Sequence, residues 1–255
     1  RVAAPGARVG GMTRQAAEET GFTEGTPVMA GMTDGCASQV STGAVAPRQW
    51  NSTLGTTLVI KGVSRELLRD PTGSVYCHRH PDGFWLPGGA SNTGAECMAR
   101  RFDRAQLEAF SAEALRHAPT DMIAYPLART GERFPFLKKE AQGFILGEVA
   151  DEAKIYTAYM EGVGYLERLA YEMLQKMGAE VGDEIHVAGG TAKITAWLQL
   201  RADILSKTLL APANSGGAMG AAVIAAGGTV YEGIVPAARA MVRIMMWIRL
   251  CVTSS

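Results

Sequence analysis

Glycine pairs and glycine-containing turns stand where a strand pattern gives way to a helix pattern, and this placement restricts the chain to few architectures. The segment EIHVAGGTAKITAWLQLRADIL (184–205) predicts a strand, a glycine turn and a helix in that order. The segment GGAMGAAVIAAGG (216–228) then predicts a helix whose small side chains allow close packing of backbones or of a flat ligand. Strand and helix patterns alternate through the second half, so the fold class is α/β or α+β and not a bundle or sandwich.

Four further segments predict regular elements. TPVMAG (26–31) is typical of a short buried strand, and residues 34–44 follow as a small-residue helix or turn region. WNSTLGTTLVIKGVS (50–64) has β-branched residues on both sides of a central glycine, which predicts a hairpin. Residues 151–177 carry apolar side chains at spacings of three and four, which predicts a long helix that faces the core.

Composition excludes several classes of partner. The chain has 255 residues, 47% of them hydrophobic, enough for one large core or two modest ones. Lys plus Arg and Asp plus Glu both count 25, which argues against a nucleic acid partner. The four cysteines include no CxxC pair, so we expect reduced thiols and a cytoplasmic location. The apolar run 240–252 is interrupted by Arg243 and Arg249 and is too short for a membrane span, so a terminal helix or a segment foreign to the fold is expected there.

Asp34, within AGMTDGCAS, comes directly after the predicted strand 26–31. In open α/β sheets this position is favoured for catalytic groups, so a carboxylate there is a candidate general base. Capping aspartates are nevertheless far commoner than catalytic ones, and the local sequence alone favours a helix N-cap.

Two glycine segments could accommodate phosphate. LGTT (54–57) offers a glycine that lets phosphate approach the backbone and two hydroxyls that can donate to it, although an ordinary hairpin turn has the same composition. VAGGTAK (187–193) places two glycines between a buried strand and a helix, where helix-terminal amides and absent side chains leave room for a nucleotide. Neither segment is a GxGxxG or Walker motif.

Other polar residues have simpler interpretations. Glu132 and Arg133 in GERFPF lie in a loop, where the arginine could meet phosphate but is expected to pair with a carboxylate. His78 and His80 lie on one face of a predicted strand without a third ligand, so no metal site is expected. Asn92 is predicted to cap the helix that follows it.

Taken in chain order, five segments resemble the FGGY carbohydrate kinases, the sugar-kinase branch of the fold shared by actin, hexokinase and the large heat-shock chaperones. The segments are TPVMAGMTDGCAS, LGTTLVIKG, YPLARTGERFPF, VAGGTAKITAWLQLRADIL and GGAMGAAVIAA, and they cover most of residues 20–228. WNSTLGTTLVIK and WLPGGASNTG are similar to D-ribulose and D-xylulose kinases, which implies a ketopentose substrate. The resemblance implies two RNase-H-like domains with a cleft between them, the first binding sugar and the second binding ATP.

The resemblance also implies a set of site residues. Asp34 matches the catalytic base, which takes the proton from the primary hydroxyl of the sugar. The second domain contributes a phosphate hairpin and an adenosine motif, and phosphoryl transfer implies Mg²⁺ together with ATP. These cofactor-binding residues are Gly55, Thr56 and Thr57 in the hairpin and Gly189, Gly190 and Thr191 in the adenosine motif.

Two departures from the family pattern bear on specificity. Members usually have Asn or Gln directly after the catalytic aspartate, where the amide can hold a sugar hydroxyl, but this chain has Gly35. Ile194 likewise stands where a polar group near the adenine is common. The sugar and the preferred nucleotide are therefore left open.

The resemblance divides the chain into residues 1–45, the C-terminal remnant of the sugar-binding domain, and residues 46–255, the ATP-binding domain. The N-terminal domain is expected to be a missing partner, so this chain alone is expected to be inactive. Apolar positions such as Val28 and Met29 are expected to be exposed and could promote formation of a homo-oligomer. Two alternatives stay open: a kinase for another sugar or polyol, such as L-ribulose or glycerol, and a non-catalytic nucleotide-binding or interaction module.

Overall fold

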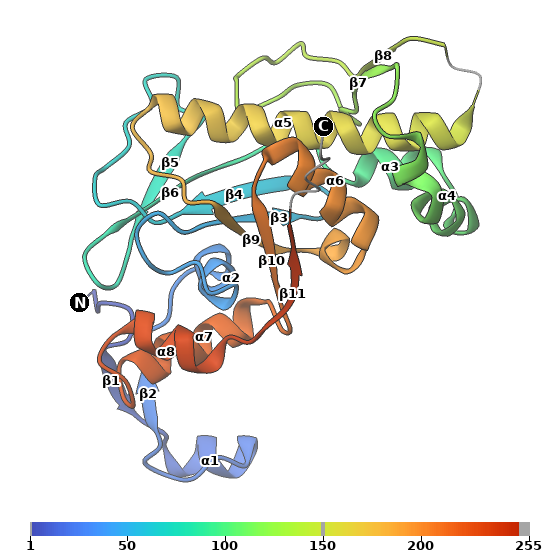
Figure 1. The fold of residues 1–255 in the computed structure, drawn as a ribbon. Coiled ribbons are helices and arrows are strands. Elements are labelled where there is room, and N and C mark those ends of the chain that lie inside the picture. Colours follow the sequence, from blue (N-terminus) through green and yellow to red (C-terminus); the bar gives the residue numbers. More distant parts are fainter. Residues whose placement is uncertain (1, 149–150, 250–255) are drawn as a thin grey trace.

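A mixed sheet of seven strands organises the molecule (Figure 1). The computed structural model describes residues 2–148 and 151–249. Along the sheet the strand order is β11-β10-β9-β3-β4-β6-β5. The strands are β3 (Trp50–Leu54), β4 (Leu58–Gly62), β5 (Tyr76–Arg79), β6 (Trp85–Ala90), β9 (Glu184–Ala188), β10 (Thr208–Pro212) and β11 (Ile244–Ile248). β3, β9 and β10 run parallel, and the remaining neighbours are antiparallel.

Helices cover both faces of this sheet, with α5 above it and α2, α7 and α8 below it in Figure 1. The main apolar core lies between the sheet and α5, α6 and α4, and a second cluster joins α2, α7 and α8. The helices are α2 (Asp34–Ser41), α3 (Glu96–Arg101), α4 (Arg104–His117), α5 (Glu152–Lys176), α6 (Thr195–Leu205), α7 (Gly217–Gly227) and α8 (Ile234–Met241). A 3-10 turn, η1 (Gly190–Lys193), precedes α6, and a small hairpin of β7 (Ile123–Tyr125) and β8 (Phe144–Leu146) lies beside α5.

The predicted hairpin and long helix are confirmed. β3 and β4 pair from Trp50↔Gly62 to Leu54↔Leu58, so residues 55–57 form the turn. α5 buries the predicted apolar stripe, and the Asp151 carboxylate caps it by accepting bonds from two backbone amides. Inside the core, the Glu167 carboxylate of α5 accepts two bonds of 2.7 and 2.8 Å from the Arg201 guanidinium of α6, with both side chains fully buried. This ion pair joins the two main helices of the upper layer.

The small-residue helix α7 packs backbone to backbone on α2. A Cβ atom at Gly220 would lie only 1.7 Å from the carbonyl oxygen of Ala37, so a side chain there is excluded. α2 is also bonded to the sheet, because Gln39 donates to the Gly62 carbonyl of β4 and the Thr42 carbonyl accepts from His186 of β9. Of the two sequence interpretations for α7, close backbone packing is confirmed.

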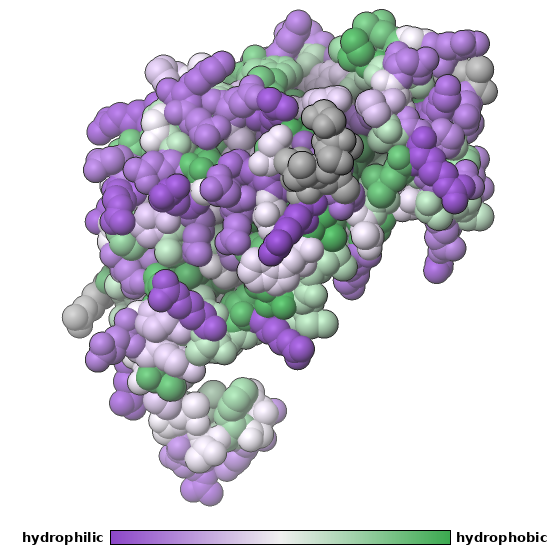
Figure 2. All heavy atoms as spheres, in the orientation of Figure 1, coloured by the Kyte–Doolittle hydropathy of each residue, from purple (hydrophilic) through white to green (hydrophobic). Residues whose placement is uncertain are grey.

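The N-terminal segment lies at the lower end of the molecule in Figure 1. β1 (Arg8–Gly11) and β2 (Pro27–Met29) lie beside α8, and α1 (Arg14–Thr20) stands off the rest of the molecule in Figures 1 and 2. The prediction of a buried strand at 26–31 is wrong, because β2 pairs with β1 alone among the described residues and two of its three residues are exposed. Val28 is 39% exposed, as expected for an apolar residue on a free surface, and Met29 is half-buried.

Two further local predictions are wrong. A terminal helix or a segment foreign to the fold was expected at 240–252, but residues 244–248 form β11 and continue the sheet, because the edge of β10 offers free backbone groups. Residues 250–252 lie outside the described residues. Asn92 does not cap α3, which has Ala95 at its N-cap position; the Asn92 amide donates instead to the Gly131 carbonyl. No helix in residues 2–148 and 151–249 combines the length and apolar character that spanning a bilayer requires.

Candidate functional site

Asp34 is the first residue of α2, and its side chain is exposed at the end of the helix. The N-cap position belongs to Thr33, so the interpretation of Asp34 as the cap is wrong. The Asp34 carboxylate accepts a 2.8 Å bond from the Gly35 amide, which is the sole bond the described residues give it. One oxygen therefore remains available to a ligand at the N-terminal end of α2.

The turn between β3 and β4 carries two hydroxyls that no described residue bonds. Its carbonyl groups are bound, since Ala95 and Glu96 at the start of α3 donate to the oxygens of Gly55 (2.8 Å) and Thr56 (3.2 Å). Thr56 is exposed, and no described residue bonds the side-chain hydroxyl of Thr56 or Thr57. The backbone of the turn is thus fixed while its hydroxyls are free to donate to a ligand oxygen.

The glycine segment after β9 packs directly on the end of β3. Gly189 has a φ of +92°, and a Cβ there would lie 2.3 Å from the carbonyl oxygen of Leu54. The Thr191 hydroxyl donates to that same oxygen at 3.1 Å. Gly190, in contrast, has open space where its Cβ would be. The structure therefore brings the two predicted glycine segments together at the carboxyl ends of the parallel strands β3 and β9.

We expect substitutions at these two glycines to differ in their effect on stability. Gly189→Ala forces an L-residue into the left-handed region and against Leu54, so we expect the free energy of unfolding to fall by more than about 2 kcal/mol. Gly190→Ala should change the free energy of unfolding by less than about 0.5 kcal/mol, because nothing opposes the new methyl group. Urea unfolding followed by circular dichroism measures both values. Equal stability of the two variants would contradict the packing described above.

A cavity of about 860 Å³ lies beside the glycine segment. It is an open pocket bounded by α3, α4 and residues 191–197, and its lining is mainly apolar, with Leu107 and Leu115 of α4 and Ile194 and Trp197 among the lining residues. The contribution of α4 was missed by sequence reasoning, because its residues lie far from the glycine motif and have no distinctive pattern. A flat, largely apolar group that reaches the predicted phosphate hairpin fits this space.

Gly94 is a second residue that sequence reasoning missed. A Cβ atom at Gly94 would lie 2.5 Å from both the Thr56 oxygen and the Thr57 Cα, so only glycine allows the chain to cross the turn. Its position within the similar segment WLPGGASNTG was the available signal.

The expected pairing of Arg133 with a carboxylate is not formed among the described residues. Its neighbour Glu132 is buried and accepts bonds from the hydroxyls of Ser91, Thr93 and Tyr125. Burial, with the Glu132 charge adding to it, raises the pKa of Tyr125 far above its ordinary value. Glu132 therefore fixes the loop between β6 and α3, and this role was not predicted.

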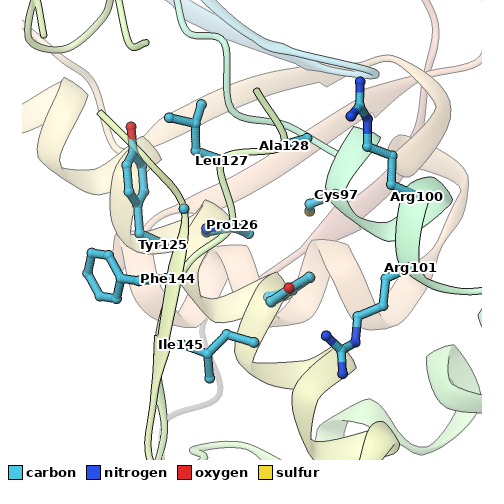
Figure 3. Close-up of a pocket in the computed structure, with 11 residues that line it drawn as sticks. Cys97, Arg100, Arg101, Tyr125, Pro126, Leu127, Ala128, Phe144 and Ile145 are labelled. Atoms are coloured by element: carbon cyan, nitrogen blue, oxygen red, sulfur yellow. The ribbon is translucent and has the colours of Figure 1, made fainter. Parts of the chain in front are cut away.

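A separate cavity of about 520 Å³ lies between α3 and the β7–β8 hairpin, lined by Arg100, Arg101 and Tyr125 among others (Figure 3). Both arginines are already paired, Arg100 with Glu96 at 2.9 Å and Arg101 with Glu152 at 2.8 Å. None of the predicted site residues lines it. It is therefore not the phosphate site that the sequence predicts.

The described residues contain no group of three His, Cys, Asp or Glu side chains that could hold a metal ion. His80 is buried and bonds the Val45 carbonyl at 2.9 Å, and burial lowers its pKa, so it is a neutral structural residue. Cys36, Cys77 and Cys97 are free thiols, while Cys251 lies outside the described residues.

The sequence of the chain is similar to known proteins over most of its length. Residues 51–228 match the model of the FGGY family of carbohydrate kinases, C-terminal domain, and the chain belongs to this family. A xylulose kinase of Bacillus subtilis is 30% identical over 233 residues, which cover 87% of this chain and 46% of that protein. A gluconokinase of Bacillus licheniformis is 25% identical over 210 residues, covering 75% of this chain and 41% of the relative. The chain spans about half the length of the curated relatives it matches.

Solved structures agree on the fold. A xylulose kinase from Lactobacillus acidophilus superposes with a TM-score of 0.85 at 20% identity, covering 98% of this chain and 52% of that one. Glycerol kinase from Plasmodium falciparum, solved with ADP, gives 0.81 at 15% identity and covers 97% of this chain and 51% of that one. The predicted fold class, that of the sugar kinases of the actin and hexokinase type, is thereby confirmed. The domain boundary at residue 45 stays a prediction.

Proposed function

We propose that the whole protein to which this chain belongs transfers the γ-phosphoryl group of ATP to a primary hydroxyl of a sugar. The observation that carries this proposal is the junction at the end of β3, where the Thr191 hydroxyl joins the glycine segment to the turn with two free threonine hydroxyls. Fixed donors of this kind suit phosphoryl transfer, which depends chiefly on positioning and on neutralising phosphate oxygens.

The proposed nucleotide lies across this junction. Its base occupies the apolar cavity between α4 and residues 191–197, and its phosphates extend toward Thr56 and Thr57. The open space at Gly190 admits the nucleotide, and the nearby amides and hydroxyls donate to its oxygens. Mg²⁺ arrives as part of the MgATP substrate and neutralises phosphate charge.

Asp34 is proposed as the general base. Its exposed carboxylate accepts the proton of the primary hydroxyl while the sugar oxygen attacks the γ-phosphorus and ADP leaves. The sugar itself is held against Asp34 by the preceding half of the whole protein, which is the partner this chain lacks. We therefore expect the chain alone to bind nucleotide without useful turnover.

For the acceptor we propose a ketopentose, D-ribulose or D-xylulose, since the 30%-identical relative is a xylulose kinase. Gluconokinase relatives make a sugar acid the alternative to be tested beside it. A cytoplasmic location and a homo-oligomer also stay predictions, the first from the free thiols and the second from the exposed surface of β1 and β2.

Calorimetric titration of the chain with ADP and Mg²⁺ tests the nucleotide site. We expect saturable binding that Gly190→Asp weakens at least tenfold, because the new carboxylate enters the space assigned to the phosphates and repels them. Gly10→Asp is the matched control, since Gly10 also has open space around it but lies on β1, remote from the junction. A folded chain that binds no nucleotide, or variants that bind equally well, would count against the proposal.

A further inference from the structure

Lys61 is a buried lysine without an anionic partner. It lies on β4, it is only 5% exposed, and it takes part in none of the ion pairs formed by the described residues. Its sole hydrogen-bond partner there is the Cys36 thiol, with 3.8 Å between Nζ and Sγ. A sulfur atom is a weak acceptor, so the three donors of a buried ammonium are left largely unsatisfied.

The surrounding sheet makes room for this side chain. A Cβ atom at Gly88, the residue opposite Lys61 on β6, would lie 2.8 Å from the lysine Cγ, so the stem passes over a glycine. The ammonium then lies 5.8 Å from the ring centre of Tyr76 on β5. Lys61 is thus directed across the sheet to a defined place instead of reaching solvent.

The neighbouring groups do not neutralise the charge. The His78 ring lies against Tyr76, and its buried Nδ1 has no partner among the described residues. Burial, helped by the Lys61 charge, lowers the pKa of His78, so this ring is neutral. Arg133 is a second cation nearby, close enough for its charge to oppose the rise that burial causes in the pKa of Tyr76. Tyr76, His78 and Arg133 therefore offer Lys61 no carboxylate. The Asp34 carboxylate, at the start of α2, forms no ion pair with Lys61 among the described residues.

The ammonium lies against Gly35, the residue that follows the proposed base. A Cβ atom at Gly35, the residue after Asp34, would be 3.2 Å from the lysine Nζ. Because Gly35 has no side chain, nothing of that residue stands between the start of α2 and the ammonium. The ammonium and the Asp34 carboxylate therefore belong to the same end of α2.

We infer that Lys61 is a specificity residue for the acceptor and that its ammonium binds an oxygen that only accepts hydrogen bonds. This inference rests on the proposed function. An ammonium only donates, whereas a hydroxyl both donates and accepts, so the best complement is a carbonyl or carboxylate oxygen. In a ketopentose this is the carbonyl oxygen, the single functional group that distinguishes the ketose from its pentitol. In a sugar acid it is the carboxylate.

Kinetics of the whole protein with matched acceptors test the inference. The acceptors are D-ribulose with ribitol, D-xylulose with xylitol, and D-gluconate. We expect Lys61→Met to lower kcat/KM for the ketose by about 10- to 100-fold, mainly through KM, and to change the value for the pentitol less than threefold. Lys176→Met, on the exposed end of α5, is the control and should change neither value.

The substitution should fold, since a methionine of similar shape replaces a buried charge. Lys61→Gln, which keeps a neutral donor, should lose less than Lys61→Met and serves as the second variant. A loss of kcat/KM confined to D-gluconate would also support the inference, with the carboxylate of a sugar acid as the oxygen that Lys61 binds. Equal losses on ketose and pentitol in a folded variant would overturn the inference and leave the proposed function intact. Failure of the folded, nucleotide-binding wild type to phosphorylate any acceptor would overturn both.

Discussion

Replacing Asp34 with asparagine is expected to lower kcat of the whole protein on its acceptor by about 100- to 10,000-fold. The amide keeps the size of the carboxylate but cannot take the proton from the attacking hydroxyl. Asp34 is exposed and bonds only the Gly35 amide among the described residues, so the folded state loses little. Coupled measurement of ADP formation, together with the thermal midpoint of both proteins, separates a loss of rate from a loss of structure.

Asp121→Asn is the matched control for this experiment, because Asp121 is also exposed and precedes β7, far from α2 in the sequence. It should leave kcat unchanged. ADP binding should also be unchanged in the Asp34 variant, since the nucleotide is assigned to the other end of the site. A loss of kcat smaller than tenfold would show that Asp34 is not the base.

The second large effect concerns stability. Glu167→Ala is expected to lower the free energy of unfolding by about 3–5 kcal/mol, because it leaves the fully buried Arg201 guanidinium without its carboxylate. One guanidinium nitrogen, Nη1, already has no partner among the described atoms, so no other group can compensate. Denaturant titration followed by near-ultraviolet circular dichroism gives the value directly.

The same helix provides the control. Glu172 pairs with Arg168 at 2.9 Å, but both side chains are about half exposed, so Glu172→Ala should cost at most about 1 kcal/mol. Replacing Glu167 and Arg201 together by Leu and Met should recover most of the lost stability, since no buried charge remains. A single Glu167→Ala variant as stable as the wild type would mean that the pair is solvated in the protein.

Local patterns predicted the parts of the fold that depend on neighbouring residues. The hairpin of β3 and β4 follows from β-branched residues around a turn, and α5 follows from its apolar stripe. The glycine pair was predicted to make room near a nucleotide, and the two glycines differ in the space around them. Gly190 is open, whereas Gly189 serves the contact with Leu54.

Other features depend on tertiary contacts and could not be predicted from the sequence. The strand β11 forms because an unpaired edge of β10 is nearby, and β2 is largely exposed because the one strand that pairs with it among the described residues is β1. Glu132 lies forty residues from the loop that it bonds. The Lys61 ammonium lies against Gly35, which is distant from it in the sequence, and the inferred role of Lys61 depends on that contact. Periodicity and motif spacing carry no information on such pairs, so these site features needed coordinates.

The backbone contact of α2 with α7 has a mechanical consequence for catalysis. Gly220 against Ala37, with the bonds from α2 to β4 and β9, makes the helix that starts at Asp34 part of the same rigid unit as the turn at Thr56. The distance from the proposed base to the predicted phosphate hairpin is then set by folding and not by ligand binding. On the proposed function, the sugar hydroxyl would have to be brought to a base and a phosphate site that are already in place.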